Sequence, residues 1–120
     1  MDSHIINPAD EALVRPDIKE SLDAYVHHGR PLGDFLEAVV ANLLVDAISH
    51  ADTYNMTTIA AIAGYVYNRL PYNSWGSRAV YHCWVAWHNA LRTCETKASP
   101  EVDSAHEALT VAYLEAKARR

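Results

Sequence analysis

The chain has 120 residues, a formal net charge of −5 and a composition in which half of the residues are hydrophobic. This balance argues against disorder, and a chain of this length can bury the core of one domain without disulfides or a structural metal. No apolar run approaches the roughly 18 to 20 residues of a membrane span, and the N-terminus lacks the features of a signal peptide. Two cysteines are too few for a disulfide framework. We therefore expect a cytoplasmic protein without membrane association.

Helix-breaking residues divide the N-terminal half into two predicted helices. The first covers 16–28, because Pro16 suits a first helical turn and Gly29 can stop the helix. The second covers 34–48, where the apolar positions occupy more than one stripe. We expect this second helix to be central and mostly buried, with the amide of Asn42 inside its apolar run.

Three more helices are predicted in the C-terminal half. The third begins at Asp52 or Thr53, which can cap it, and ends at Pro71. The fourth covers about 77–95, and the fifth starts at the Ser99-Pro100 pair and continues to the basic C-terminus.

No segment of appreciable length alternates between apolar and polar residues with the period of a strand. We therefore predict an all-α fold, a compact bundle of four to five helices. Residues 16–120 are expected to form this single domain, preceded by a flexible N-terminal arm at 1–15.

The charges are distributed unevenly along the chain. Residues 1–52 contain ten acidic and three basic side chains, whereas 53–94 contains no Asp or Glu. The same stretch holds all three tryptophans and five of the seven tyrosines. Rings that stack and cations that pair with phosphate are the components of a nucleotide site. The alternative is a buried aromatic stripe with an ordinary solvated basic face, and duplex nucleic acid is a poorer partner because the protein is acidic overall.

A candidate ligand site follows from this aromatic and basic stretch. Arg78, His82 and Arg92 fall on one face of the fourth predicted helix and would contact phosphate. Trp75 or Tyr67 would stack on a base, and His28 with Arg30 would close the site from the connector at 29–33. The alternatives for the connector are a structural hairpin and, for His28, a helix C-cap on the surface. The candidate ligand-binding residues are therefore His28, Arg30, Tyr67, Trp75, Arg78, His82 and Arg92.

No motif for catalysis or metal binding is present. The sequence contains no HExxH, no CxxC and no pair of histidines at metal-ligand spacing. Neither cysteine has the sequence context of a nucleophile, and no serine occupies a GxSxG elbow. We expect no catalytic residue, no metal and no cofactor, so the protein is not expected to be an enzyme.

Three motifs within residues 16–80 carry a family resemblance: Tyr25-x-x-His28-Gly29-x-Pro31-x-Gly33-x-Phe35-Leu36, then Asn42, then Tyr65-Val66-Tyr67-Asn68-x-Leu70-Pro71 with Trp75-Gly76-Ser77. In these motifs the chain resembles a family of small uncharacterised helical proteins encoded by tailed phages and prophages. Leu43 stands where that family usually has an aspartate after the asparagine. The resemblance implies a phage accessory protein in the bacterial cytoplasm, and proteins of this kind often act against host defence.

The leading hypothesis is a non-catalytic anti-defence protein that sequesters an anionic nucleotide-like ligand, such as a nucleotide second messenger. The rival is a protein–protein inhibitor that binds a host defence protein, and a structural or regulatory phage subunit is a third interpretation. A nucleotide hydrolase ranks last. The surplus of Trp and Tyr also favours a homo-oligomer, because such rings suit an interface.

Overall fold

The computed structural model describes residues 11–94 and 98–119, and in these ranges the chain forms six helices and no strand. The helices are α2 (Pro16–His28), α3 (Asp34–Val40), α4 (Leu44–His50), α5 (Thr53–Arg69), α6 (Arg78–Thr93) and α7 (Pro100–Ala118). The predicted all-α class is confirmed. The predicted number of four to five helices is too low, because the second predicted helix is divided in two. None of the described helices has the length and apolar character of a membrane span.

The division between α3 and α4 occurs at Asn42, which has a positive φ of 63°. The N–H of Asn42 donates to the carbonyl of Val39 (3.1 Å), and the N–H of Leu43 donates to the carbonyl of Ala38 (2.9 Å). This pair of bonds closes a helix end around a left-handed residue, a conformation that Asn tolerates better than most residues. The prediction of one continuous helix over 34–48 is therefore wrong.

The turn at Asn42 also changes which side chains are buried. Helix α3 keeps most of its apolar residues in the core, but α4 buries Ala47 alone. Leu44 and Val45 are 63% and 79% exposed, and Asn42 itself is exposed. The expectation of a mostly buried helix with a buried amide is wrong for this second half, because the chain changes direction before α4 begins.

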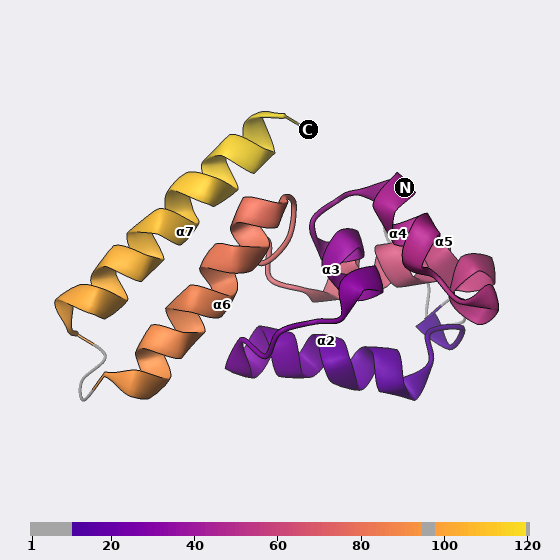
Figure 1. Ribbon diagram of the computed structural model, residues 1–120, viewed down its shortest axis with the longest axis horizontal. Coiled ribbons are helices and arrows are strands. Elements are labelled where there is room, and N and C mark those ends of the chain that lie inside the picture. Colours follow the sequence, from indigo (N-terminus) through magenta and orange to yellow (C-terminus); the bar gives the residue numbers. More distant parts are fainter. Residues whose placement is uncertain (1–10, 95–97, 120) are drawn as a thin grey trace.

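Helix α6 lies at the centre of the arrangement, between α2 and α7, while α3, α4 and α5 form the other end of the molecule (Figure 1). The antiparallel helices α6 and α7 lie side by side, and the rings of Trp87 and His106 meet between them at 5.1 Å.

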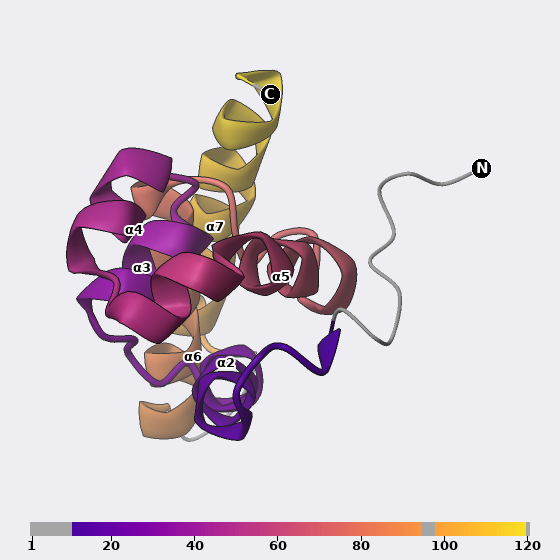
Figure 2. The ribbon, with the colours of Figure 1, turned by 90° about the vertical axis from the view of Figure 1, so that its right-hand side faces the viewer.

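Buried hydrogen bonds join α6 to α2. The indole N–H of Trp84 donates to the carbonyl of Tyr25 (2.8 Å). The hydroxyl of Tyr25 in turn donates to the carbonyl of Ser74 (2.7 Å), so α2, α6 and the loop before α6 are joined through buried polar contacts. In the view of Figure 2, α5 lies above α2, with α3 and α4 beside it.

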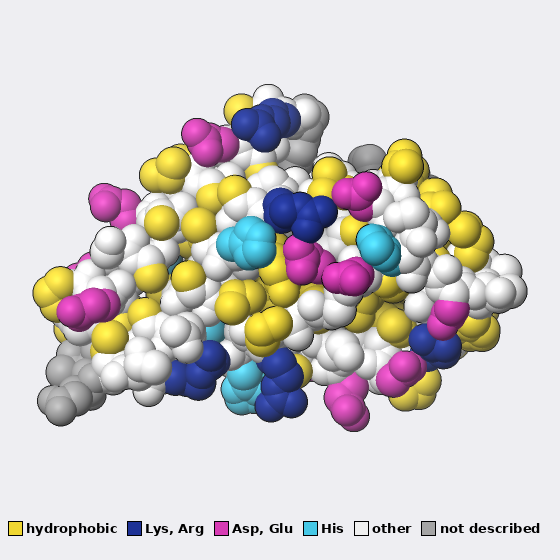
Figure 3. Space-filling view, in the orientation of Figure 1, with side chains coloured by type: hydrophobic (Ala, Val, Ile, Leu, Met, Phe, Trp, Pro, Cys, Tyr) yellow, Lys and Arg dark blue, Asp and Glu magenta, His cyan; other side chains and the backbone are white. Residues whose placement is uncertain are grey.

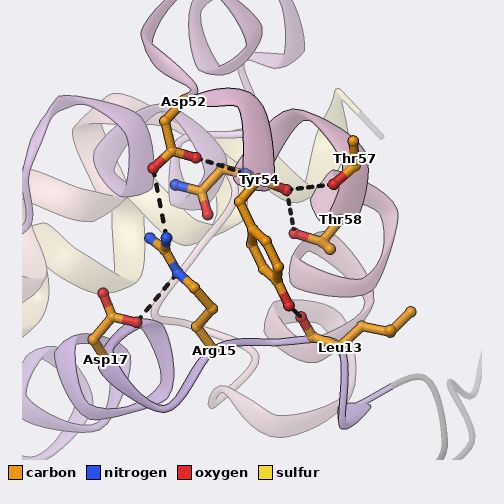
Figure 4. A network of polar contacts seen from close by, with 8 residues as sticks. Leu13, Arg15, Asp17, Asp52, Tyr54, Thr57 and Thr58 are labelled. Atoms are coloured by element: carbon orange, nitrogen blue, oxygen red, sulfur yellow. Dashed lines mark hydrogen bonds and ion pairs between the residues drawn. The ribbon is translucent and has the colours of Figure 1, made fainter.

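A polar network attaches the chain before α2 to the start of α5 (Figure 4). The guanidinium of Arg15 lies 3.3 Å from Asp17 and 3.6 Å from Asp52, and it also covers the ring of Tyr54 at 5.2 Å. The hydroxyl of Tyr54 donates to the carbonyl of Leu13 (3.2 Å). Asp52 accepts a backbone N–H in the first turn of α5, as its predicted capping role requires. Of the predicted flexible arm, residues 1–10 lie outside the described residues, and 11–15 carry these contacts.

Candidate anion-binding site

The connector between α2 and α3 is held closely against α6. Gly29 ends α2 with a φ of +65°, and a Cβ at this position would lie 2.2 Å from Cβ of His88. Further along, the N–H of Leu32 donates to the hydroxyl of Tyr81 on α6 (3.0 Å). The helix stop predicted at Gly29 is confirmed, and the glycine is required twice: for the left-handed backbone and for the close approach of two helices.

Four residues of the connector region and α6 surround a hollow of about 410 Å³, named here the basic hollow: His28, Arg30, Pro31 and Arg92. The guanidinium of Arg92 donates to the carbonyl of His28 at the end of α2 and to Oδ1 of Asn89 (3.3 Å). Among the described residues, no carboxylate lies within ion-pair distance of Arg30 or Arg92. Lys, Arg and His side chains gather along the lower edge of Figure 3, where the end of α2 meets α6. The basic hollow is therefore a place where an anion finds donors without competition from a bound carboxylate.

A second hollow of about 430 Å³, the α6 hollow, adjoins the basic hollow. It is lined by Pro31, Glu37, Tyr81, His82, Val85, Ala86, Asn89 and Arg92. The two hollows share Pro31 and Arg92, so they form one continuous depression. The lining of the α6 hollow combines the apolar side chains of Pro31, Val85 and Ala86 with polar and charged ones, which is typical of a small-ligand site.

His88 lies on α6 against Gly29 of the connector, with its ring 5.0 Å from that of Trp84. Its Nε2 is buried and forms no hydrogen bond within the described part of the chain. Burial is the main cause that lowers the pKa of His88, and electrostatic interactions with Arg92 and His28 lower it further. Burial is thus the main reason why the neutral form of His88 is favoured, and the positive field at this end of α6 adds to it.

The other arginines of the acid-free stretch are paired with acids from the N-terminal half. Nη1 of Arg78 lies 2.5 Å from Glu37, and its Nη2 lies 3.4 Å from Asp46. Arg69 donates twice to the carboxylate of Glu11, at 2.9 Å each. The charge asymmetry seen along the sequence is thus partly balanced in space. Arg78 connects α6 to α3 and α4 and does not line either of the two hollows.

The two predicted stacking residues lie elsewhere. The rings of Tyr67 and Trp75 meet at 5.8 Å and line a separate hollow of about 380 Å³. The other residues of that hollow are Val39, Asn42, Ala63, Gly64 and Val66. The structure thus brings His28, Arg30, Arg92 and, in the adjoining hollow, His82 together, but places Tyr67, Trp75 and Arg78 outside this group.

Sequence reasoning did not single out Pro31, Tyr81, Val85 and Asn89 as site residues, although all four line the α6 hollow. Val85 and Asn89 do carry a signal, since they share the helical face of His82 and Arg92. Tyr81 carries none, because its position in the hollow depends on the contact with the connector.

No protein-family model matches the chain, nor does any curated protein or solved structure.

Within residues 11–94 and 98–119, no group of three or more His, Cys, Asp or Glu side chains could hold a metal ion. The side chains that line the depression include two guanidinium groups, two imidazoles and the carboxylate of Glu37.

Proposed function

We propose that the protein binds a small anionic, nucleotide-like ligand in the basic hollow and does not transform it. The observation that carries this proposal is the convergence of Arg30 and Arg92, from segments far apart in the sequence, around one hollow without a carboxylate. A guanidinium group can donate two parallel hydrogen bonds to a phosphate, and His28 adds a third donor group beside them.

The α6 hollow would hold the uncharged part of the ligand. Val85 and Ala86 offer apolar contact to a base or sugar, while His82 and Asn89 offer hydrogen bonds to its edges. The two hollows measure about 410 and 430 Å³, which is within the range of small-ligand sites. This assignment replaces Tyr67 and Trp75 as the surface against which the ligand packs.

The biological role that we propose is that of a phage anti-defence protein, which acts in the bacterial cytoplasm by sequestering a nucleotide messenger. The resemblance of residues 16–80 to phage-encoded proteins and the basic hollow support this role jointly. The predicted homo-oligomer remains part of the proposal. A protein–protein inhibitor and a structural or regulatory phage subunit are the competing roles.

Isothermal titration calorimetry of the full chain against cyclic and linear nucleotides tests the proposal. We expect heat of binding from at least one nucleotide and at least tenfold weaker binding by Arg30→Gln and Arg92→Gln. Arg69→Gln is the matched control, because Arg69 is also an arginine of the acid-free stretch but pairs with Glu11 and lines neither hollow. Its affinity should equal that of the parent chain.

Three outcomes would overturn the proposal. One is the absence of heat from every nucleotide at tens of micromolar protein. Another is an equal loss of affinity in Arg69→Gln and Arg30→Gln, which would place the ligand elsewhere. The third is recovery of a chemically changed nucleotide, which would show an enzyme.

A further inference from the structure

A hydrophobic surface independent of the basic hollow covers α4 and α5, and we name it the α4–α5 face. On α4 it presents Leu44, Val45 and Ile48, which are 63%, 79% and 37% exposed. On α5 it presents a stripe at helical spacing, namely Met56, Ala60, Ala63 and Tyr67, all of which are exposed. Hydrophobic side chains at the right-hand end of Figure 3 lie over these two helices.

The α4–α5 face contains a groove beside a ridge. The hollow at Tyr67 and Trp75 continues into a smaller one of about 70 Å³, and the two share Val39, Asn42 and Ala63. The smaller hollow is further lined by Leu43, Leu44, Ala47 and Ile59. The groove therefore extends along α5, and the exposed side chains of α4 form the ridge beside it.

We propose that a second copy of this chain docks on the α4–α5 face to form a two-fold symmetric dimer. A face that carries a ridge and a groove side by side fits a copy of itself when a two-fold axis places each ridge in the opposite groove. Leu44, Val45, Ile48, Met56 and Tyr67 alone expose roughly 500 Å², near the upper limit for a monomer and most of the about 800 Å² that one partner of a stable interface buries.

The charge distribution supports a second copy as the occupant. Each chain carries a net charge of −5, so two copies repel one another over most of their surfaces. The groove is lined by no charged residue among those described, and α5 carries a single charged residue, Arg69, in its last turn. Charged residues are depleted at interface cores. Because α5 carries no acidic residue, two acidic chains can make contact along it without bringing carboxylates together.

The side-chain amide of Asn42 also favours a second copy of the chain as the occupant of the groove. Its exposed amide lies between the two parts of the groove and forms no hydrogen bond to the described residues. An amide is both donor and acceptor, so two Asn42 side chains that meet near a two-fold axis satisfy each other. A wholly apolar partner would instead leave each amide buried without a partner, which is unfavourable.

Sedimentation velocity of the full chain between about 1 μM and 1 mM tests the dimer. We expect a concentration-dependent change from monomer to dimer, and a dissociation constant at least tenfold higher for Val45→Glu. The matched control is Val111→Glu on α7, because Val111 is also a valine on a helix surface and is 51% exposed. That variant should dimerise like the parent chain. Far-UV circular dichroism checks that both variants keep their helices.

Asn42→Asp provides a second test with almost no change of shape, and Asp also tolerates the left-handed backbone. It should weaken the dimer at pH 7, because two carboxylates would meet across the axis.

A chain that stays monomeric up to 1 mM would overturn the proposal, whether or not it binds another protein or a lipid vesicle. Unchanged dimerisation of Val45→Glu, or loss of the dimer in Val111→Glu, would also overturn it. Nucleotide titration of Val45→Glu distinguishes a failure of this proposal from a failure of the proposed function. Because the basic hollow lies on α2 and α6, this variant should bind nucleotide like the parent chain even when it no longer dimerises.

Discussion

The two helices of the acid-free stretch, α5 and α6, belong to regions of opposite character. Around α6, side chains are fixed by specific contacts: Gly29 lies against His88, and Tyr81 accepts the connector's N–H. Around α4 and α5, large apolar side chains such as Val45 stay in solvent, and the groove beside them holds a single amide, that of Asn42. The same sequence property, the lack of Asp and Glu, therefore has two effects: Arg92 on α6 has no carboxylate at ion-pair distance among the described residues, and α5 carries no charged residue before Arg69 in its last turn.

The largest expected effect is at the contact between α2 and α6. Gly29→Ala places a methyl group against His88 and forces a left-handed backbone on a residue with a Cβ. We expect a loss of about 3 kcal/mol in the free energy of unfolding. Urea denaturation measures it, with Gly33→Ala as the control, because a Cβ at Gly33 would meet nothing within 4 Å. Equal urea midpoints for the two variants would show that the close contact is absent.

The next effect compares the same substitution in both regions. Val80 on α6 is fully buried and Val45 on α4 is 79% exposed. Val80→Ala removes two buried methyl groups and should lower the free energy of unfolding by about 2 kcal/mol. Val45→Ala should change it by less than about 0.5 kcal/mol in dilute, monomeric protein. If the two variants lost similar stability, α4 would have to be packed in solution.

A smaller effect concerns the pH dependence of stability. In the unfolded chain His88 takes up a proton near its ordinary pKa of 6.5, whereas its pKa in the folded protein is lowered. The unfolded state then binds more protons, so stability should fall as the pH falls from above 6.5 through the folded pKa. The difference in urea midpoint between pH 7.5 and pH 5.5 should therefore be smaller for His88→Gln than for the parent chain. An unchanged difference would exclude His88 as its source.

The smallest effect is expected at the exposed ion pair of Glu11 and Arg69. The hydrogen bond from Arg69 lowers the pKa of Glu11 below 4.5, so this contribution to stability is present above that pH and is lost as the pH falls through the folded pKa. Glu11→Gln should lower the urea midpoint slightly at pH 7 and low salt. The difference from the parent chain should vanish at pH 2.5 or in 1 M salt, because protonation or screening removes the pair. A difference that persists under both conditions would contradict an ion-pair origin.

Most helices could be predicted because their ends depend on neighbouring residues. Pro16 and Gly29 bound α2, and the side chains of Asp52, Ser77 and Ser99 accept backbone N–H groups at the starts of α5, α6 and α7. The break between α3 and α4 was missed because Asn42 stands in an apolar run that has helical spacing. Asn is compatible with both a helix interior and a left-handed end, and the tertiary structure decides between them.

The candidate site was predictable only where its residues share one local element. His82 and Arg92 lie on one face of α6, and their spacing indicated this. The pairing of Arg78 with Glu37 and Asp46 was not predictable, because these acids come from two other helices. The separation of Tyr67 from the cations has the same cause: it depends on how α5 packs relative to α6.

The hydrogen bond from Arg92 to the carbonyl of His28 connects the basic hollow to the stability of the last turn of α2. Arg92 binds the C-terminal end of α2 and also lines the hollow, so the ligand proposed above would contact the same guanidinium that holds the helix end. By thermodynamic linkage, if binding of that ligand changes the stability of the last turn of α2, a change in the stability of that turn alters the ligand affinity by the same factor. We therefore expect amide hydrogen exchange in the last turn of α2 to change when the proposed ligand occupies the hollow, without a label on the ligand.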